Sequence, residues 1–354
     1  MKIAVLLSGG VDSSVALNLL LDEKKHDLVA YYLKIWLEDE LAFLGECPWE
    51  EDLKYARAVC EQAKVPLEVI SLQDEYQNKI VGYVLKELKE GRTPSPDIYC
   101  NERIKFGVFF NHLHEKFDKV ATGHYAKIKQ NDDESYSLLR APDSVKDQTY
   151  FLSNLNQKQL SKIIFPLGDY KKNRVRELAS EYNLPNKSRK DSQGICFLGK
   201  IPYNDFVKFH LGEKPGNIVE LETNKILAQH KGVWFHTIGQ RKGLGLGGGP
   251  WYVVKKDLEK NIVYISHSEK FESCSKNSFM VRDINWINGE VSSDNVKELK
   301  LRHGPEMIAC DLMKKSKNVY LVTISKPDTG IAEGQHAIFY NDEECLGGGI
   351  IRIE

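Results

Sequence analysis

The sequence predicts an α/β domain with a parallel sheet over the first 205 residues, followed by two β-rich domains. Short apolar runs alternate with segments of helical period through residue 125, a pattern typical of βαβ units on a parallel sheet. Beyond about residue 205, apolar and polar residues alternate between turn signals, which indicates β structure. A chain of 354 residues is also too long for one ordinary core.

The elements of the first domain follow one another in order. Buried strands are predicted at KIAVLL (2–7), LVAYYLKIW (28–36), PLEVISL (66–72) and KVATGHY (119–125). Helices are predicted over 13–23, 52–64, about 75–90 and 101–116. Because ligands bind beyond the carboxyl ends of parallel strands, we expect the site at that edge of the sheet.

The remainder of the chain is predicted to be β structure. The segments that indicate it are 216–230, 232–243, 250–267 and 318–326. Glycine and proline in FHLGEKPGN (209–217) mark the boundary between the alternating strand and helix pattern and the β pattern. We therefore expect a small β-rich central domain over 206–270 and a C-terminal β-barrel over 271–354.

Composition limits the class of protein. Hydrophobic residues make up 42% and charged residues 28%, as in soluble globular proteins, and no apolar run suits a signal peptide or a membrane span. We therefore expect a cytoplasmic protein with reduced thiols. The seven cysteines form no CxxC pair, so no structural zinc site is expected. The net charge of −1 means that a polyanion would need basic clusters such as 171–176, 187–190 and 241–242, which otherwise indicate solvated surface.

The segment Ser8-Gly9-Gly10-Val11-Asp12-Ser13-Ser14 follows the first predicted strand and leads straight into a helix. Paired glycines let backbone amides approach phosphate oxygens, while serine hydroxyls and the helix amino terminus add donors and positive potential. We interpret Asp12 as a residue that holds Mg²⁺ or fixes the turn. The sequence lacks GxxxxGK(S/T), which excludes the phosphate loop of nucleotide hydrolases that cleave at the γ-phosphate.

SGGVDSS resembles the signature of the PP-loop ATP pyrophosphatases, which have an adenine nucleotide alpha hydrolase-like fold. The resemblance implies that the protein uses ATP to transfer AMP to an oxygen of its substrate. Adenylation converts a carbonyl oxygen, which is a poor leaving group, into a good one. The implied ATP-site residues are Leu6, Leu7, Ser8, Gly9, Gly10, Val11, Asp12, Ser13, Leu33 and Gly123.

Two cysteines indicate sulfur as the nucleophile that attacks the adenylate. Cys100 lies in TPSPDIYCNERIKFG (93–107), close to a predicted helix amino terminus, whose dipole stabilises a thiolate. Cys196 lies in RKDSQGICFLGK (189–200), a polar segment with a lysine nearby. Either cysteine alone is more often a small core residue than a catalyst.

Together with their flanks, both cysteine segments resemble signatures of the bacterial and organellar tRNA-specific 2-thiouridylases. Further matching stretches are ATGHYAK (121–127), KDQTYFL (146–152), FPLGDYKKNRVRELA (165–179), TIGQRKGLG (237–245), PWYVVKKD (250–257) and CLGGGII (345–351). The resemblance implies that Cys196 carries sulfur as a persulfide, and that this persulfide, or hydrosulfide released from it, attacks the adenylated carbon of the wobble uridine. Cys100 would be the second catalytic cysteine and would release the sulfur through a Cys100–Cys196 disulfide. Asp97 would act as a base or base-positioning group.

The same resemblance implies the nucleic-acid contacts and the partners. Ser95, Pro96 and Asp97 would contact the target base, and Lys146, Asp147, Gln148, Arg302 and His303 would contact the tRNA. The family usually has Tyr in place of His303, and many relatives have Asn in place of Ser95. The implied partners are tRNAs for Lys, Glu and Gln and a sulfur donor such as a cysteine desulfurase or sulfur-relay protein. ATP and Mg²⁺ are the implied cofactors, and a monomer is expected.

Two other functions remain open on the residues alone. A PP-loop ligase fed with ammonia predicts a glutaminase segment or an ammonia-delivering partner, and we find no glutaminase-like segment in the sequence. A non-catalytic RNA-binding protein with a redox-active cysteine pair predicts tRNA binding that ignores ATP. That second alternative leaves SGGVDSS without a purpose.

Overall fold

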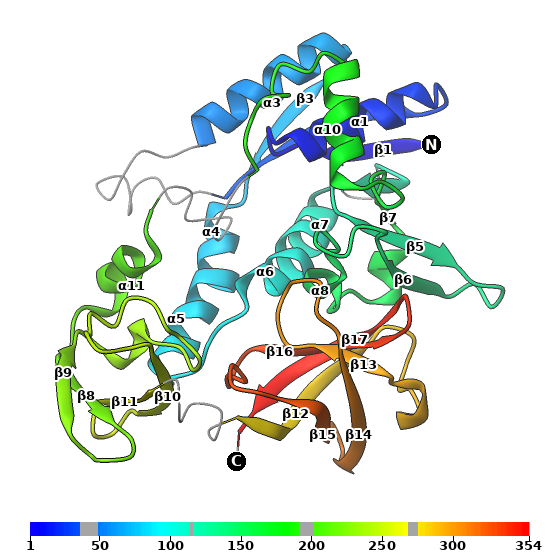
Figure 1. The fold of residues 1–354 in the computed structure, drawn as a ribbon. Coiled ribbons are helices and arrows are strands. Elements are labelled where there is room, and N and C mark those ends of the chain that lie inside the picture. Colours follow the sequence, from blue (N-terminus) through cyan, green and yellow to red (C-terminus); the bar gives the residue numbers. More distant parts are fainter. Residues whose placement is uncertain (36–48, 114–115, 192–200, 268–274, 354) are drawn as a thin grey trace.

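The computed structural model describes residues 1–35, 49–113, 116–191, 201–267 and 275–353 (Figure 1). Its amino-terminal part is built on a parallel sheet with strand order β3-β2-β1-β4-β7. These strands are β1 (Lys2–Leu6), β2 (Asp27–Lys34), β3 (Leu67–Ser71), β4 (Lys119–Ala121) and β7 (Ile163–Ile164). Every neighbouring pair is parallel, so the carboxyl ends of all the strands meet at one edge.

Helices cover both faces of this sheet. The helices α1 (Val11–Asp22), α3 (Trp49–Ala63) and α10 (Lys172–Glu181) lie on one side. On the other side, residues of β1 share a core with α4 (Gln73–Tyr76), the π-helix Gln77–Val81, α5 (Gly82–Lys89), α6 (Pro96–Tyr99), the π-helix Cys100–Val108 and α7 (Phe109–Leu113), and α5 extends from the parallel sheet toward the central part of the chain (Figure 1). In β1, Ile3 and Val5 join the core on the first side, whereas Ala4 and Leu6 join the core on the second. This two-sided burial explains the unbroken apolar run of β1.

A smaller sheet with strand order β10-β11-β8-β9 forms the central part of the chain. Its strands are β8 (Gly216–Glu220), β9 (Ile226–His230), β10 (Trp251–Asp257) and β11 (Ile262–His267). The helix α11 (Tyr203–Leu211) precedes the sheet and contacts α5. Ile218, Val253, Val263 and Ile265 form the separate core of this part.

The C-terminal part is a closed antiparallel barrel, in which β12 pairs with both β15 and β17. Its strands are β12 (Lys276–Trp286), β13 (Glu298–Lys300), β14 (Ile308–Ser316), β15 (Val319–Asp328), β16 (His336–Asn341) and β17 (Glu344–Arg352). Two 3-10 turns lie at Val233–Phe235 and Ser293–Asn295. The predicted fold class, a parallel-sheet α/β domain followed by a small β-rich domain and a barrel, is confirmed.

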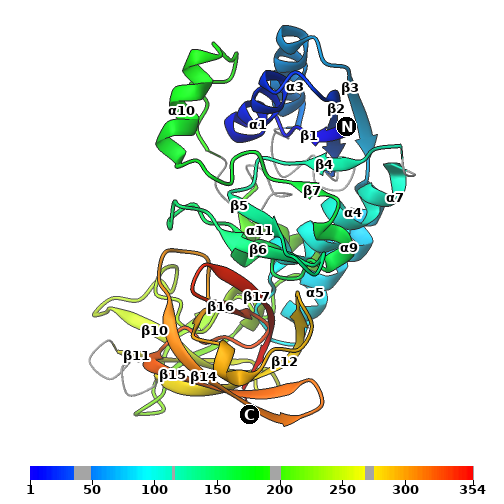
Figure 2. The same cartoon turned by 90° about the vertical axis from the view of Figure 1, so that its right-hand side faces the viewer.

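The hairpin of β5 (Ala126–Gln130) and β6 (Tyr136–Arg140) links the amino-terminal part to the barrel, because β6 pairs with β17. Figure 2 shows this hairpin between the parallel sheet and the barrel. The short helices α8 (Thr149–Leu152) and α9 (Gln157–Leu160) follow in the same region. The hairpin is therefore part of the barrel's sheet, although it follows β4 of the parallel sheet in the chain.

Three sequence predictions differ from the structure in detail. The strand predicted over 119–125 ends at Ala121, because Gly123 packs against α1 and the chain then turns into β5. The helix predicted from residue 101 begins at Pro96, where proline suits the first helical turn. Residues 232–243 form a 3-10 turn and loop instead of β structure, because Trp234 folds back against Gly232. A search of the described residues found no helix long and apolar enough to cross a membrane.

Candidate active site

The loop between β1 and α1 has the geometry of an anion-binding turn. Gly9 takes a φ of +74°, and a Cβ atom there would lie 2.2 Å from the backbone oxygen of Asp52 in α3. Both the left-handed conformation and the close backbone therefore demand glycine. Gly10 is the extended N-cap residue of α1 and brings no side chain that could occupy the amino-terminal N–H groups. Those groups and the helix dipole together favour a phosphate at this point.

Serine hydroxyl groups hold the loop from within. The Ser13 hydroxyl donates to the carbonyl oxygen of Gly10 at 3.1 Å and accepts from the backbone N–H of Ser8 at 3.2 Å. The Ser14 hydroxyl donates to the same carbonyl at 2.9 Å. These bonds fix the conformation of the loop before any ligand binds, which reduces the entropy cost of binding.

The segment that follows α10 supports the loop from outside. The Asn186 side-chain amide donates to the carbonyl oxygen of Gly9 at 2.8 Å, and Arg189 donates to the same oxygen at 3.1 Å. Arg189 also forms an ion pair with Asp52. Residues nearly 180 positions apart along the chain thus hold one peptide group, a contact that sequence spacing could not reveal.

The other predicted ATP-site residues lie along the same sheet edge. Leu6, Leu7 and Val11 are buried, and Leu33 lies near the end of the adjacent strand β2. Gly123 follows β4, and a Cβ atom there would lie 2.7 Å from the backbone nitrogen of Ser13. The structure therefore brings the residues predicted for ATP binding together around the start of α1.

Asp12 lies in the first turn of α1 and pairs with a lysine from α10. The Lys172 ammonium group contacts both carboxylate oxygens of Asp12, at 2.7 and 2.9 Å. The Tyr125 hydroxyl donates to the same carboxylate at 2.9 Å, and burial raises the pKa of Tyr125 well above its ordinary value. Asp12 therefore ties the start of α1 to Lys172 and Tyr125, while its expected role in holding Mg²⁺ or fixing the turn stays a prediction.

Asp191 extends this network toward a predicted tRNA-binding residue. Its carboxylate accepts from Lys146 at 2.8 Å and from Lys172 at 2.8 Å, and it also pairs with Arg176. Burial opposes ionisation of Asp191, but the hydrogen bonds from Lys146 and Lys172 outweigh it and hold its pKa well below the usual range. Asp12 and Lys146 are thus connected through Lys172 and Asp191.

Cys100 is 2% exposed and belongs to the core beneath the parallel sheet. It is the first residue of the π-helix that continues α6, so the continuous helical run begins at Pro96 and not beside the cysteine. The helix dipole acts mainly within the first turn, so it stabilises a Cys100 thiolate less than the sequence suggested. Cys196, the other predicted catalytic cysteine, lies outside the described residues.

The predicted base-contact residues lie one turn before Cys100. Ser95 is partly buried and its backbone N–H donates to the Tyr83 hydroxyl at 3.1 Å, while Pro96 is buried. Asp97 is largely enclosed, and burial raises its pKa although the charge of Lys105 opposes the shift. A carboxyl group with a raised pKa can take up and release a proton nearer neutral pH.

Asp147 differs from the surface contact that the sequence predicted. Its side chain is fully buried and accepts from the Lys300 ammonium group in the barrel at 2.8 Å. The Thr149 hydroxyl donates to it at 2.9 Å, and Arg140 lies 3.4 Å away. The Asp147 carboxylate therefore ties the amino-terminal part to the barrel and does not reach the surface in this structure.

The remaining predicted tRNA contacts surround this buried pair. The His303 ring stacks on Phe151 with a centroid separation of 4.8 Å. Gln148 exchanges hydrogen bonds with the backbone of Tyr125, the tyrosine that contacts Asp12. Residues from separate parts of the chain thus form one continuous region beside the phosphate loop.

Arg302 lies half exposed next to the same region. It forms an ion pair with Asp328, and its charge acts on the buried Tyr150 together with that of Asp97. The Tyr150 hydroxyl donates to the backbone of Leu301, next to the predicted tRNA-contact pair Arg302 and His303, and its helix α8 contacts α6, which begins with the predicted base-contact residues Pro96 and Asp97. Burial raises the pKa of Tyr150 beyond its ordinary value, so this hydroxyl stays protonated.

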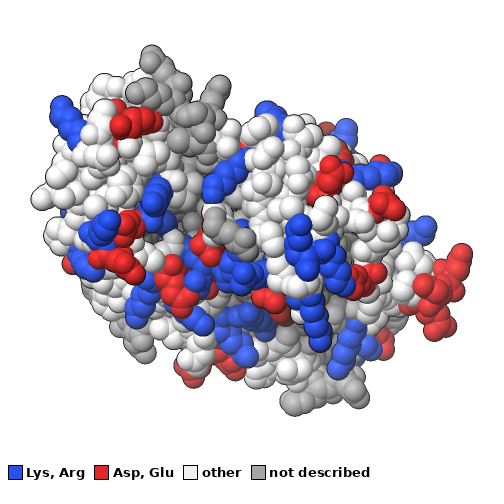
Figure 3. Space-filling model, turned by 90° about the horizontal axis from the view of Figure 1, so that it is seen from below, with Lys and Arg blue, Asp and Glu red and all other residues white. Residues whose placement is uncertain are grey.

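Basic side chains group locally on one face of the molecule. Figure 3 views the molecule from below, from the side of the barrel and the central sheet in Figure 1, and basic side chains form a band across the middle with acidic side chains among them. With an overall charge of −1, such local grouping is the way in which this protein can attract a polyanion.

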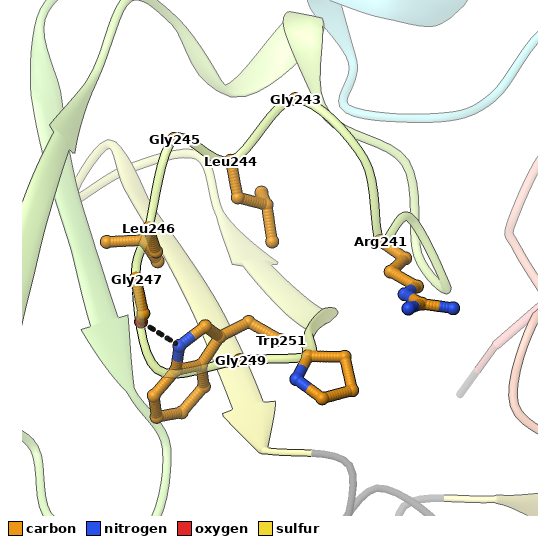
Figure 4. A pocket seen from close by; sticks show the side chains of 9 residues that line it. Arg241, Gly243, Leu244, Gly245, Leu246, Gly247, Gly249 and Trp251 are labelled. Carbon is orange, nitrogen blue, oxygen red and sulfur yellow. Dashed lines mark hydrogen bonds between the residues drawn. The ribbon is translucent and has the colours of Figure 1, made fainter.

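A separate pocket of about 600 Å³ lies in the central part of the chain (Figure 4). The glycine-rich loop 241–251 forms it, and the Trp251 indole donates to the carbonyl oxygen of Gly247 at 3.1 Å. None of the predicted site residues lines this pocket. We therefore assign the chemistry to the sheet edge and not to this loop.

The residues that hold the site together cannot be recognised from their place in the sequence. Lys172, Arg176 and Arg189 were placed only in basic clusters, and Asp191 and Asn186 were not singled out. The segments that contain Lys172 and Asp191 carried a family resemblance, which was the available signal. Among the described residues, no group of three or more His, Cys, Asp or Glu side chains could hold a metal ion.

Three family models together match almost the whole chain. They are the tRNA methyl transferase HUP domain over 1–200, the tRNA methyl transferase PRC-barrel domain over 204–267 and the aminomethyltransferase beta-barrel domain over 276–351.

Individual relatives match over their full length. The chain is 45% identical to the tRNA-specific 2-thiouridylase MnmA 1 of Bacteroides thetaiotaomicron, over 99% of each chain. It is 43% identical to tRNA-specific 2-thiouridylase MnmA of Parabacteroides distasonis, again over 99% of each chain. The corresponding protein of Porphyromonas gingivalis is 41% identical over the same share of both chains. The resemblance seen in the sequence is therefore confirmed, and the chain belongs to the tRNA-specific 2-thiouridylase family.

Proposed function

We propose that the protein is an ATP-dependent tRNA sulfurtransferase that replaces the 2-carbonyl oxygen of the wobble uridine with sulfur. The observation that carries the proposal is the connection of the phosphate loop to the predicted tRNA segment. Asp12 reaches Lys146 through Lys172 and Asp191, with each contact between 2.7 and 2.9 Å. Such a network suits an enzyme that must bring ATP and a tRNA base together.

The first chemical step is adenylation. The uridine O2 attacks the α-phosphorus of ATP and pyrophosphate leaves, so the loop 8–14 has to hold the phosphate charge. The amino terminus of α1 suits that task, and so do Gly9 and Gly10, whose lack of side chains lets the backbone come close to the phosphates. Mg²⁺ would neutralise phosphate charge, with Asp12 as the carboxylate that the loop itself provides. Since no described cluster could hold a metal by itself, the ATP phosphates would supply most of its ligands.

Sulfur transfer follows. We assign the persulfide to Cys196, whose terminal sulfur attacks C2 of the uridine while AMP leaves with the original oxygen. Cys100 then attacks the Cys196 sulfur, so that a Cys100–Cys196 disulfide forms and the terminal sulfur stays on C2. A reductant must restore both thiols before the next cycle. Asp97, whose pKa is raised by burial, would hold or move a proton beside the base.

The remaining assignments follow from this chemistry. Residues 1–205 would carry catalysis, residues 206–270 would form the central domain, and the barrel at 271–354 would contact tRNA. Ser95, Pro96 and Asp97 would meet the target base, and Lys146, Gln148, Arg302 and His303 would meet the rest of the tRNA. The proposed partners are tRNAs for Lys, Glu and Gln and a cysteine desulfurase or sulfur-relay protein. A monomer working in the cytoplasm, where its substrate resides, fits these roles.

The experiment is nucleoside mass spectrometry of unmodified tRNA incubated with the protein, ATP, Mg²⁺ and a sulfide source. We expect a 2-thiouridine peak that disappears without ATP and in the Cys196→Ser protein. Persistence of the peak in that variant would overturn the role of Cys196. The ammonia-dependent alternative is not favoured, because the full-length relatives carry the name of thiouridylases.

A further inference from the structure

A fully buried ion pair joins the barrel to the amino-terminal part of the chain. Lys300, the last residue of β13, lies 2.8 Å from the Asp147 carboxylate, and both side chains are 0% exposed. The Lys300 ammonium group also lies over the ring of Tyr340, 5.5 Å from its centroid. Figure 1 shows the neighbourhood, where α8 meets β13 and β16.

Stability alone does not explain this pair. Removing two charges from water is costly, and well-packed apolar residues hold such junctions equally well or better. An ion pair adds specificity of position, because it favours one relative placement of the two segments that carry it. Asp147 is further held by Thr149 and Arg140, so its position relative to its own segment is fixed.

The two segments that the ion pair holds together are those predicted to contact tRNA. Lys146 and Gln148 flank Asp147, while Arg302 and His303 lie two and three residues beyond Lys300. The His303 ring stacks on Phe151, with a centroid separation of 4.8 Å, and Phe151 belongs to the helix α8 that begins two residues after Asp147.

We propose that Lys300 is a positioning residue for tRNA recognition, acting through Asp147 on the spacing between segments 146–148 and 302–303. This inference rests on the proposed function, since it assumes that both segments contact tRNA. Lys300 itself touches no ligand, because its side chain is completely enclosed.

The test compares Lys300→Met with Lys297→Met in the full-length protein. Lys297 is a matched control, because it lies three residues away and pairs with Asp342 on the surface, with both side chains more than half exposed. We expect Lys300→Met to raise the Kd and the KM for tRNA about tenfold, with kcat at saturating tRNA and the KM for ATP little changed. Lys297→Met should behave like the unaltered protein in all four quantities. Equal tRNA affinity in a folded Lys300→Met protein would overturn the inference.

A second variant separates positioning from stability. In Asp147→Asn with Lys300→Met, no unpaired charge from the pair is buried, and the amide oxygen can still accept from Thr149. We expect this double variant to unfold at a higher temperature than Asp147→Asn alone, yet to keep the weakened tRNA binding. Recovery of full tRNA affinity together with stability would show that the pair is only structural. If the unaltered protein neither binds nor thiolates tRNA, the proposed function fails instead.

Discussion

Gly123 offers a direct way to perturb the phosphate loop without touching any side chain in it. In Gly123→Ala, the new Cβ would lie 2.7 Å from the backbone nitrogen of Ser13 and 2.9 Å from the carbonyl carbon of Asp12. Ordinary contacts begin at 3.4 Å, so the end of β4 and the start of α1 must separate by about 0.7 Å. Both neighbours are backbone atoms, which cannot swing aside as a flexible side chain could.

The expected cost falls on catalysis more than on folding. Overpacking of this kind lowers the free energy of unfolding by about 1–3 kcal/mol. A displacement of about 1 Å at a reacting centre costs roughly a hundredfold in rate, so we expect kcat/KM for ATP to fall about ten- to a hundredfold. The assay measures AMP release in the presence of tRNA at several ATP concentrations, alongside thermal unfolding.

Gly82→Ala supplies the matched control. Gly82 begins α5 and is exposed, and an added Cβ would meet its nearest atom, the Gln77 carbonyl oxygen, at 3.6 Å. This change should stabilise the helix by about 0.5–1 kcal/mol and leave the kinetics unaltered. If Gly123→Ala keeps its kcat/KM for ATP while Gly82→Ala behaves as expected, the start of α1 is not the phosphate site.

Three further predictions test other parts of the account. Cys100→Ser should abolish 2-thiouridine formation, whereas Cys310→Ser should retain it. Burial raises the pKa of the Cys310 thiol to about 12, so this thiol stays protonated and unreactive. Mass spectrometry of the tRNA nucleosides measures the 2-thiouridine formed by each variant. Lys172→Met removes the cation that pairs with Asp12, and we expect a raised KM for ATP in the AMP-release assay, with an unchanged KM counting against the network. Burial, aided by the charge of Arg103, lowers the pKa of His336 from 6.5 to about 4, so this residue is neutral in the folded protein. The unfolded chain takes up the proton first, so the stability that depends on a neutral His336 is lost as the pH falls from 6.5 toward 4. That loss amounts to about 3 kcal/mol, and urea unfolding of His336→Gln should show a correspondingly weaker pH dependence.

Local patterns were enough to predict the sheet and the loop. The apolar run of β1 and the glycines that follow it are consecutive in the chain, so their meaning depends on few other contacts. The same holds for β2 and β3, whose register along β1 follows from the βαβ connections.

Long-range contacts decided what the sequence could not predict. The basic residues after position 170 looked like solvated surface, yet Lys172 and Arg189 turn toward the phosphate loop from 160 and 180 residues away. The family resemblance implied that Asp147 contacts tRNA, but its side chain is buried against Lys300, which is 153 residues distant. Only the tertiary fold brings such charges together. A charged side chain that is buried in this way holds neighbouring segments in place and does not contact a ligand.

The central claim is that ATP activates the 2-carbonyl oxygen of a tRNA uridine and that AMP then carries this oxygen away. It is tested most directly with tRNA labelled with ¹⁸O at the uridine O2, turned over with ATP and a sulfide source. The account predicts that each 2-thiouridine formed yields one AMP with ¹⁸O in its phosphate group, while pyrophosphate stays unlabelled. Label in water or pyrophosphate, or thiolation without labelled AMP, would contradict it.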